Sequence, residues 1–450
     1  MKIRHTLFAT LFIALNASCY LFLGARTANG SAAGTGHVAR TPADTQSCDT
    51  DSVVPPSWSE QLHARLQPLI DEAERSSYYM GLCIYDLTAD TLITAYNQQK
   101  SMRPASTQKL LTAISALDLY GKQYRYNTNV YRNGDNVHIV GAFDPLISTD
   151  DLRNLARTLQ EQFGDTIRGL VIADVSMKDT CQLGNGWCWD DVPSNNIPYL
   201  TPLFFNHELP IDLPRDVKGR PLTLKPKFVF HPEQYFLTTL ADELKALGVG
   251  VAPRQLTVQT QTLLAPQATG RLIFQCSHTF EQALQPMMKQ SDNLFAESMF
   301  YQLGLREKSQ GVTWKEGAHQ VESVLRRAGV DTDRVKVADG SGISLYNYVS
   351  PQAEVTMLRY AYRQRAIFDA LYPSLPIAGI DGTLDTRMVK GAAKGNVHAK
   401  TGTVTGVTCL AGYVRASNGN LLAFSIMHNG VMKAAIGRDH EDRICEALAQ

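Results

Sequence analysis

The feature that most constrains the fold is a short stretch, RPASTQKLL at 103–111, in which a serine and a lysine begin an otherwise apolar helix. Pro104 suits the first turn of a helix, and the apolar residues after Lys109 recur at helical spacing. Residues three apart share a helix face, so the Lys109 amine can reach the Ser106 hydroxyl. The sequence therefore predicts a helix that buries one side in a core and presents these two polar groups together.

This pair is the first candidate catalytic group. A serine hydroxyl is a weak nucleophile until a base takes its proton, and a lysine amine can be that base where burial or a second cation lowers its pKa. A helix N-terminus adds backbone N–H donors where an oxyanion would form. Taken alone, however, a Ser-x-x-Lys pattern also fits an exposed lysine after a capping serine.

A second motif, Ser291-Asp292-Asn293, lies between two predicted helices, 279–289 and 294–303. A short connection of this kind can project polar side chains into a cleft. The motif alone fits helix capping better, but its position between two other motifs favours a catalytic role.

A third motif, Lys400-Thr401-Gly402-Thr403, opens a run of alternating residues that continues to residue 414. The alternation predicts a strand. Without the other motifs, Lys400 would fit an exposed charge and Thr401-Gly402 a β-bulge.

Ser-x-x-Lys, Ser-x-Asn and Lys-Thr-Gly in this order are typical of penicillin-binding proteins and serine β-lactamases. From about residue 57 to its C-terminus the chain resembles the class C low-molecular-mass penicillin-binding proteins, a D-alanyl-D-alanine carboxypeptidase and endopeptidase family that is S13-like. Residues 141–145 (GAFDP), 186–191 (GWCWDD), 339–344 (DGSGIS) and 379–384 (GIDGTL) also resemble stretches typical of that family.

The expected fold is α/β, with strands near both ends of the chain sharing one sheet. Predicted strands at 81–86, 92–96, 404–414 and 421–428 should form a central antiparallel sheet with helices on its faces. The resemblance implies a serine β-lactamase-like α/β/α sandwich.

Strands and helices also alternate between the first and second motifs, which predicts a separate inserted α/β domain at 125–269. Residues 57–124 and 270–450 would then form the penicillin-binding domain.

The resemblance also implies roles for the first two motifs. Ser106 would attack the carbonyl between two D-alanines, and Lys109 would take its proton. Ser291 would relay a proton to the leaving amine, while Asn293 would bind the substrate amide and orient Lys109.

Further roles follow from the third motif. Lys400 would keep the site electropositive, and the Thr401 hydroxyl would bind the terminal carboxylate of the substrate next to Gly402. The backbone N–H groups of Ser106 and Thr403 would hold the oxyanion.

The predicted function is a serine-type D-alanyl-D-alanine carboxypeptidase, DD-endopeptidase or both, acting on peptidoglycan stem peptides and inhibited by β-lactams. A β-lactamase or esterase on the same fold is the alternative, and a non-catalytic wall-binding protein is a third. The long insertion disfavours the β-lactamase and esterase, and the intact motifs disfavour the wall-binding protein. No cofactor is expected, and no Cys-x-x-Cys or His-Glu-x-x-His pattern supports a metal site. The formal net charge of +0 gives no sign of a nucleic-acid partner.

The N-terminus predicts export. Lys2, Arg4 and His5 precede an apolar run at 7–23, so residues 1–33 fit either a cleaved signal peptide or a retained inner-membrane anchor. Residues 34–56 are rich in small and polar residues and predict a flexible tether. The expected location is the periplasm or cell envelope.

Two minor predictions concern Asp144 and the cysteines. The resemblance suggests that Asp144 points toward the cleft, although an Asp-Pro turn explains this residue equally well. The chain has eight cysteines, and Cys181 and Cys188 form the favoured disulfide pair because they lie close together in a turn-rich loop.

Overall fold

The computed structural model describes residues 57–188, 197–208, 231–261 and 270–450. The predicted signal or anchor and the predicted tether lie outside the described residues. None of the described helices is both long and apolar enough to cross a bilayer.

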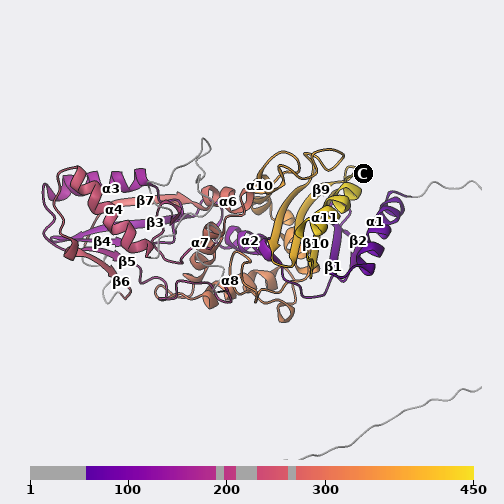
Figure 1. Ribbon diagram of the computed structural model, residues 1–450, viewed down its shortest axis with the longest axis horizontal. Helices are drawn as coiled ribbons and strands as arrows, with labels where there is room; N and C mark the ends of the chain where they lie inside the picture. Colours follow the sequence, from indigo (N-terminus) through magenta and orange to yellow (C-terminus); the bar gives the residue numbers. More distant parts are fainter. Residues whose placement is uncertain (1–56, 189–196, 209–230, 262–269) are drawn as a thin grey trace, which may run out of the picture. The chain divides into compact units, whose positions relative to one another are not determined.

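Five strands form an antiparallel sheet in the order β2-β1-β10-β9-β8, as expected for the central sheet. The strands come from both ends of the described chain (Figure 1). They are β1 (Tyr79–Asp86), β2 (Thr91–Tyr96), β8 (His398–Val404), β9 (Val407–Arg415) and β10 (Leu421–Asn429).

The predicted strand at 404–414 differs in one respect. The alternating run from Lys400 is two strands, β8 and β9, because the chain turns at Thr405-Gly406 and Gly406 adopts a φ of 76°. A positive φ is readily adopted by glycine, so this residue permits the turn. β8 consequently lies at the edge of the sheet.

Helices bury both faces of this sheet, which confirms the α/β/α arrangement. Leu82 and Ile84 of β1 pack into a core with α1 (Trp58–Arg75) and α11 (Ala434–Ala449). Cys83, which points to the opposite face, packs into a second core that contains α2 (Gln108–Tyr120). The remaining helices of this core are α6 (Phe280–Lys289), α7 (Asn293–Gly304), α8 (Trp314–Arg327), α9 (Pro351–Arg363) and α10 (Arg365–Ser374).

A second sheet has the order β6-β5-β4-β3-β7 and is mixed, since β4, β5 and β6 are parallel while β3 is antiparallel to β4 and β7. α3 (Thr149–Phe163) and α4 (Pro232–Ala246) pack with it in a third core. The strands are β3 (Arg125–Asn133), β4 (Asn136–Val140), β5 (Val171–Asp174), β6 (Leu256–Gln259) and β7 (Arg271–Thr279).

This second sheet extends beyond residue 269. β7 pairs with β3 as far as Thr279, so the sheet ends at the start of α6. The described residues form one compact unit. The division into a penicillin-binding domain and an inserted domain stays a prediction.

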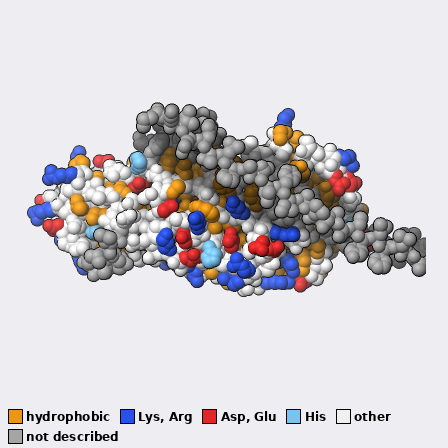
Figure 2. Space-filling model, turned by 90° about the horizontal axis from the view of Figure 1, so that it is seen from below, with side chains coloured by type: hydrophobic (Ala, Val, Ile, Leu, Met, Phe, Trp, Pro, Cys, Tyr) orange, Lys and Arg blue, Asp and Glu red, His pale blue; other side chains and the backbone are white. Residues whose placement is uncertain are grey.

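Short 3-10 turns complete the described structure: η1 (Ala105–Thr107), η3 (Asn206–Glu208), η4 (Pro253–Gln255), η5 (Thr332–Arg334) and η6 (Gly382–Leu384). On the face shown in Figure 2, Lys and Arg side chains are interspersed with Asp and Glu side chains.

Candidate active site

Ser106 lies in the 3-10 turn η1 that leads into α2. The preceding Ala105 has a φ of 48°, in the left-handed region that costs a non-glycine residue about 1–3 kcal/mol. Ala105 is buried, so packing holds the turn in this conformation. The Ser106 side chain itself is half-buried and lines a cleft.

A buried carboxyl group supports the turn from behind. Thr107 donates its hydroxyl proton to the carbonyl of Pro104 at 2.8 Å, and its Oγ1 lies 2.5 Å from Oε1 of Glu354. Burial raises the pKa of Glu354 to about 7. A protonated Glu354 can donate to the Thr107 oxygen, so both contacts can form at once and fix the turn next to Ser106.

Lys109 is 0% exposed, and its Nζ contacts three oxygen atoms. It lies 2.9 Å from Oγ of Ser106, 2.6 Å from Oδ1 of Asn293 and 2.7 Å from the carbonyl oxygen of Ser341. The last two oxygens can only accept hydrogen bonds. A neutral amine would donate its two N–H bonds to them and direct its lone pair at Ser106.

The electrostatic setting of Lys109 favours this neutral form. Burial lowers the pKa of Lys109 to about 8, although the carboxylates of Asp339, Glu297 and Asp292 act in the opposite direction. The amine is therefore a base at a pH only slightly above neutrality.

Glu297 holds the backbone that faces Lys109. Its Oε1 accepts hydrogen bonds from the N–H groups of Gly340 at 3.1 Å and Ser341 at 2.8 Å. Burial and the nearby Asp339 raise the pKa of Glu297 to about 8. A protonated Glu297 opposes the neutral form of Lys109 less than a carboxylate would.

Two glycines allow the backbone to approach the turn that carries Ser106. A Cβ on Gly342, whose φ is 86°, would lie 1.8 Å from the carbonyl oxygen of Ala105. A Cβ on Gly402 would lie 2.7 Å from the carbonyl oxygen of Pro104. Both contacts are shorter than any side chain tolerates, so these positions require glycine.

Ser291 and Lys400 form a second contact pair. Lys400 is 0% exposed, and its Nζ donates to Oγ of Ser291 at 2.7 Å and to the carbonyl of Thr401 at 2.8 Å. Burial, together with the charge of Lys109, holds the pKa of Lys400 well below its usual value. Ser291 has a φ of 60°, a strained conformation that is common at functional sites.

The structure thus brings the three motifs together. They border one cleft of ≈ 890 Å³, whose lining includes Ser106, Ser291, Asn293, Thr401 and Thr403. Lys109 and Lys400 lie buried behind these residues.

The charged residues that line the cleft in the described part of the chain are all arginines. They are Arg103, Arg387 and Arg438, and Nη2 of Arg438 donates to Oγ1 of Thr403 at 3.2 Å. Arg387 is paired with two carboxylates, Glu441 at 2.9 Å and Asp442 at 2.6 Å. The cleft therefore suits an anionic group on the ligand.

Comparison with known protein families shows which family the chain belongs to. The model of the D-Ala-D-Ala carboxypeptidase 3 (S13) family matches residues 62–209 and 207–450, which is most of the chain. The chain belongs to this family. It is a serine-type DD-peptidase and thus a hydrolase, as the ordered motifs predicted.

Relatives of known name agree with the S13 assignment. The chain is 26% identical over 409 residues to the D-alanyl-D-alanine carboxypeptidase DacB of Haemophilus influenzae, covering 78% of this chain and 85% of the relative. The fold matches the crystal structure of penicillin binding protein 4 from H. influenzae, with a TM-score of 0.73, 22% identity and coverage of 85% and 98% of the two chains. The structure of that protein complexed with a novel β-lactam matches with a TM-score of 0.67, 23% identity and coverage of 86% and 99%.

Several residues of this S13 site were not predicted. Three of them, Glu297, Asp339 and Ser341, position Lys109. Two others contact the third motif: Oγ1 of Thr383 lies 2.7 Å from Oγ1 of Thr401, and Arg438 donates to Thr403. Three of these residues, Asp339, Ser341 and Thr383, lie in the stretches 339–344 and 379–384 that resemble the family, so the sequence did point to them. Glu297 and Arg438 lie in helices, where nothing in the sequence distinguishes them from other charged residues.

Residues between the first two motifs also contact the site from outside the central sheet. Nε2 of His207 lies 2.6 Å from Oδ2 of Asp292, the middle residue of the second motif. Nε1 of Trp187 donates to Oδ2 of Asp339 at 2.8 Å. Burial acts to raise the pKa of Asp292, but His207 and hydrogen bonding hold it below its usual value.

Asp144 is not among the residues that line the cleft. It is 0% exposed, and it accepts hydrogen bonds from the backbone N–H of Leu146 at 3.0 Å and from His278, whose Nδ1 lies 2.8 Å away. This geometry is that of the Asp-Pro turn offered as the alternative.

Cys181 is a thiol in the structure, and its Sγ donates to the carbonyl of Leu183 at 3.3 Å. The disulfide predicted between Cys181 and Cys188 is therefore not formed here, and the pairing stays a prediction for oxidising conditions.

Proposed function

We propose that Ser106 is the nucleophile of this DD-peptidase and that Lys109 is its general base. The observation that carries the proposal is the set of three contacts around Lys109, in which two acceptors leave the lone pair of a neutral amine for Ser106. In this mechanism Oγ of Ser106 bonds to the substrate carbonyl carbon as its proton passes to Nζ.

The remaining motif residues act on the tetrahedral intermediate. The backbone N–H groups of Ser106 and Thr403 bind the oxyanion, an interaction worth about 3–4 kcal/mol per donor. Ser291, held by Lys400, passes a proton to the leaving amine, and the carbon–nitrogen bond breaks. Water then hydrolyses the acyl-enzyme on Ser106 with Lys109 as base.

Substrate recognition follows from the edge strand and the cations. β8 is an edge strand, so an extended peptide can pair with it and place its terminal carboxylate near Thr401 and Thr403. Arg438 supplies positive charge beside Thr403, and the buried Lys400 donates to the carbonyl of Thr401. Gly402 keeps the strand close to Ser106.

The substrate proposed on these grounds is the D-Ala-D-Ala terminus or a D-amino acid cross-link of peptidoglycan stem peptides, with β-lactams as covalent inhibitors. A related protein is named a D-alanyl-D-alanine carboxypeptidase, and the penicillin binding protein 4 structure holds a β-lactam, which supports both parts of the proposal. Product analysis with monomeric and cross-linked muropeptides distinguishes terminal trimming from cross-link cleavage. Peptidoglycan substrates also support the predicted export to the periplasm or envelope, and the apolar run at 7–23 supports N-terminal attachment to the inner membrane.

A fluorescent penicillin tests the nucleophile. We expect wild-type protein to gain the mass of one penicillin, located on the peptide that contains Ser106, and Ser106→Ala to gain none. The matched control is Ser101→Ala, an exposed serine outside the cleft, which should label like wild type. An equal adduct on Ser106→Ala, or no adduct on folded wild-type protein, would refute the assignment.

The pH dependence of acylation tests the base. The neutral fraction of Lys109 increases as pH rises through its pKa of about 8, so the second-order acylation rate should rise about tenfold per pH unit below that value and level off above it. Stopped-flow measurement with a fluorescent penicillin gives this profile. A rate that falls as pH rises through about 8 would contradict a lysine base.

A further inference from the structure

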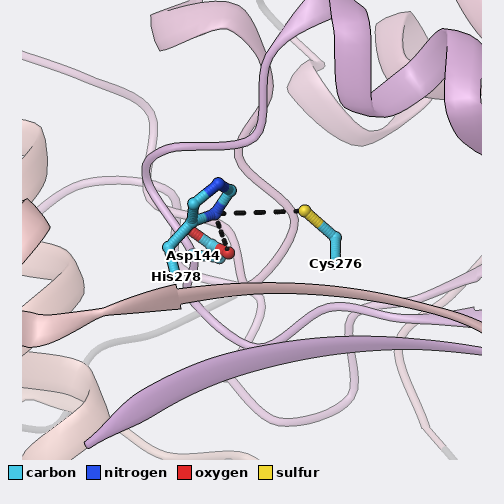
Figure 3. Close-up of side chains that lie close together, drawn as sticks. All are labelled: Asp144, Cys276 and His278. Carbon is cyan, nitrogen blue, oxygen red and sulfur yellow. Dashed lines mark hydrogen bonds and ion pairs between the residues drawn. The ribbon is translucent and has the colours of Figure 1, made fainter. Parts of the chain in front are cut away.

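Three side chains of different chemistry converge at the end of the second sheet nearest α6. Nδ1 of His278 lies 2.8 Å from Oδ2 of Asp144 and 3.9 Å from Sγ of Cys276. Figure 3 shows that the same ring nitrogen faces both the carboxylate and the thiol. The three donor atoms all lie within 4.8 Å of one another.

The local backbone explains why these groups meet. Cys276 and His278 are two residues apart on β7, so their side chains point to the same face of the sheet. Asp144 follows β4 and is 0% exposed, and Cys276 is 6% exposed. Two of the three groups are therefore buried, while 20% of the His278 side chain is exposed.

Two further polar groups complete the surroundings. Asp151, in the first turn of α3, accepts hydrogen bonds from the backbone N–H and the hydroxyl of Ser148, and its charge acts on both Cys276 and His278. Thr128 pairs with Cys276 across β3 and β7, is 3% exposed, and has no hydrogen-bond partner for its Oγ1.

A small cavity lies beside Cys276, on the side that faces Thr128 and Asp151, and Asp144 and His278 do not line it. It measures ≈ 10 Å³ and is lined by Thr128, Asp151 and Cys276 together with apolar side chains. This volume is about that of one water-sized sphere. A buried, unpartnered hydroxyl beside it indicates that a ligand or water belongs there, because such groups are normally hydrogen-bonded.

We propose that Asp144, Cys276 and His278 bind one Zn²⁺ ion, with the fourth tetrahedral position open to water. Thiolate, imidazole and carboxylate are the ligand types that zinc takes in tetrahedral sites. Metal–ligand distances of about 2.0–2.3 Å give ligand–ligand separations of roughly 3.3–3.8 Å in a tetrahedron. The present separations of 2.8 and 3.9 Å fall on either side of that range, so small side-chain movements admit the ion.

Binding has a defined proton balance. The Cys276 thiol releases its proton to the buffer as the sulfur–zinc bond forms, and His278 binds as neutral imidazole in place of its hydrogen bond to Asp144. Burial and the two carboxylates raise the pKa of the Cys276 thiol in the empty site, whereas a bound cation reverses that effect. The ion would join the loop after β4 to β7, so its role is structural.

Cobalt titration of the full-length chain, freed of metal, tests this site. We expect one equivalent of Co²⁺ to produce thiolate-to-cobalt charge-transfer absorption and the intense d–d bands of a tetrahedral site, and Zn²⁺ to abolish both. Cys276→Ser should lose the charge-transfer band, while Cys181→Ser, the exposed control thiol, should retain it. No saturable band in wild-type protein, or the same band in Cys276→Ser, would overturn the proposal.

Native mass spectrometry gives a readout that needs no variant to fold. We expect one zinc per wild-type chain and a rise in its thermal unfolding midpoint with added Zn²⁺, because the ion binds the folded state. His278→Gln, checked for folding by circular dichroism, should hold no zinc and show no rise. Wild-type protein without zinc, and with an unchanged midpoint, would leave Asp144 and His278 as a simple ion pair. Neither readout depends on Ser106, so failure here would leave the proposed peptidase mechanism intact.

Discussion

Replacing Lys109 with methionine is expected to lower the acylation rate by about 10²–10⁴-fold, the usual contribution of a general base. Methionine fills a similar volume but cannot accept the Ser106 proton. The loss should appear in the rate of penicillin adduct formation at a pH above the Lys109 pKa of about 8, where the wild-type amine is neutral.

The matched control is Lys315→Met, at an exposed position in α8 that does not line the cleft. It should acylate at the wild-type rate. Circular dichroism and the thermal unfolding midpoint should show that Lys109→Met is folded, because the new methionine side chain is apolar and position 109 is buried. A Lys109→Met variant that acylates as fast as wild type would assign the base to another group.

The second large effect is expected for Gly342→Ala, which should lower both stability and acylation. The new Cβ would lie 1.8 Å from the carbonyl oxygen of Ala105, so either the loop or the turn that carries Ser106 must move. A displacement of about 1 Å at a reacting group can cost about 10²-fold in rate. We expect an acylation rate at least about 10²-fold lower and a free energy of unfolding lower by more than about 3 kcal/mol.

Gly419→Ala separates the two causes of that loss. Gly419 has a φ of 88°, close to that of Gly342, but a Cβ there would meet no atom within 4 Å. This variant should lose only the about 1–2 kcal/mol that a left-handed conformation costs an alanine, and it should acylate normally. Denaturant unfolding and penicillin labelling of both variants measure the difference. Equal losses would show that the contact with Ala105 is unimportant.

Local patterns in the sequence predicted most of the secondary structure. The strands β1, β2 and β10 and the helices α6 and α7 begin and end within two residues of their predicted bounds, because each has clear periodicity between turn residues.

The predicted secondary structure was wrong where pairing with a neighbouring strand determines the strand and its bounds. β8 and β9 were predicted as one strand because alternation continues through Gly406, and β7 was not predicted at all. β7 is specified mainly by its pairing with β3, a contact between distant parts of the sequence. The side chains of β9 are buried on both faces of the sheet. The alternation in the sequence from which a strand was predicted is therefore not an alternation of buried and exposed residues.

The sequence by itself determined the family, the order of the three motifs and the residues proposed as nucleophile and base. Those conclusions rest on residue types and short spacings, which any copy of the chain carries whether folded or not. The tertiary structure alone decided that Lys109 is buried against Asn293 and the Ser341 carbonyl, that Glu297 and Arg438 belong to the site, and that Asp144 faces His278. Burial and contacts across long stretches of chain set the pKa of an amine and the direction of its lone pair, and neither quantity is encoded in local spacing.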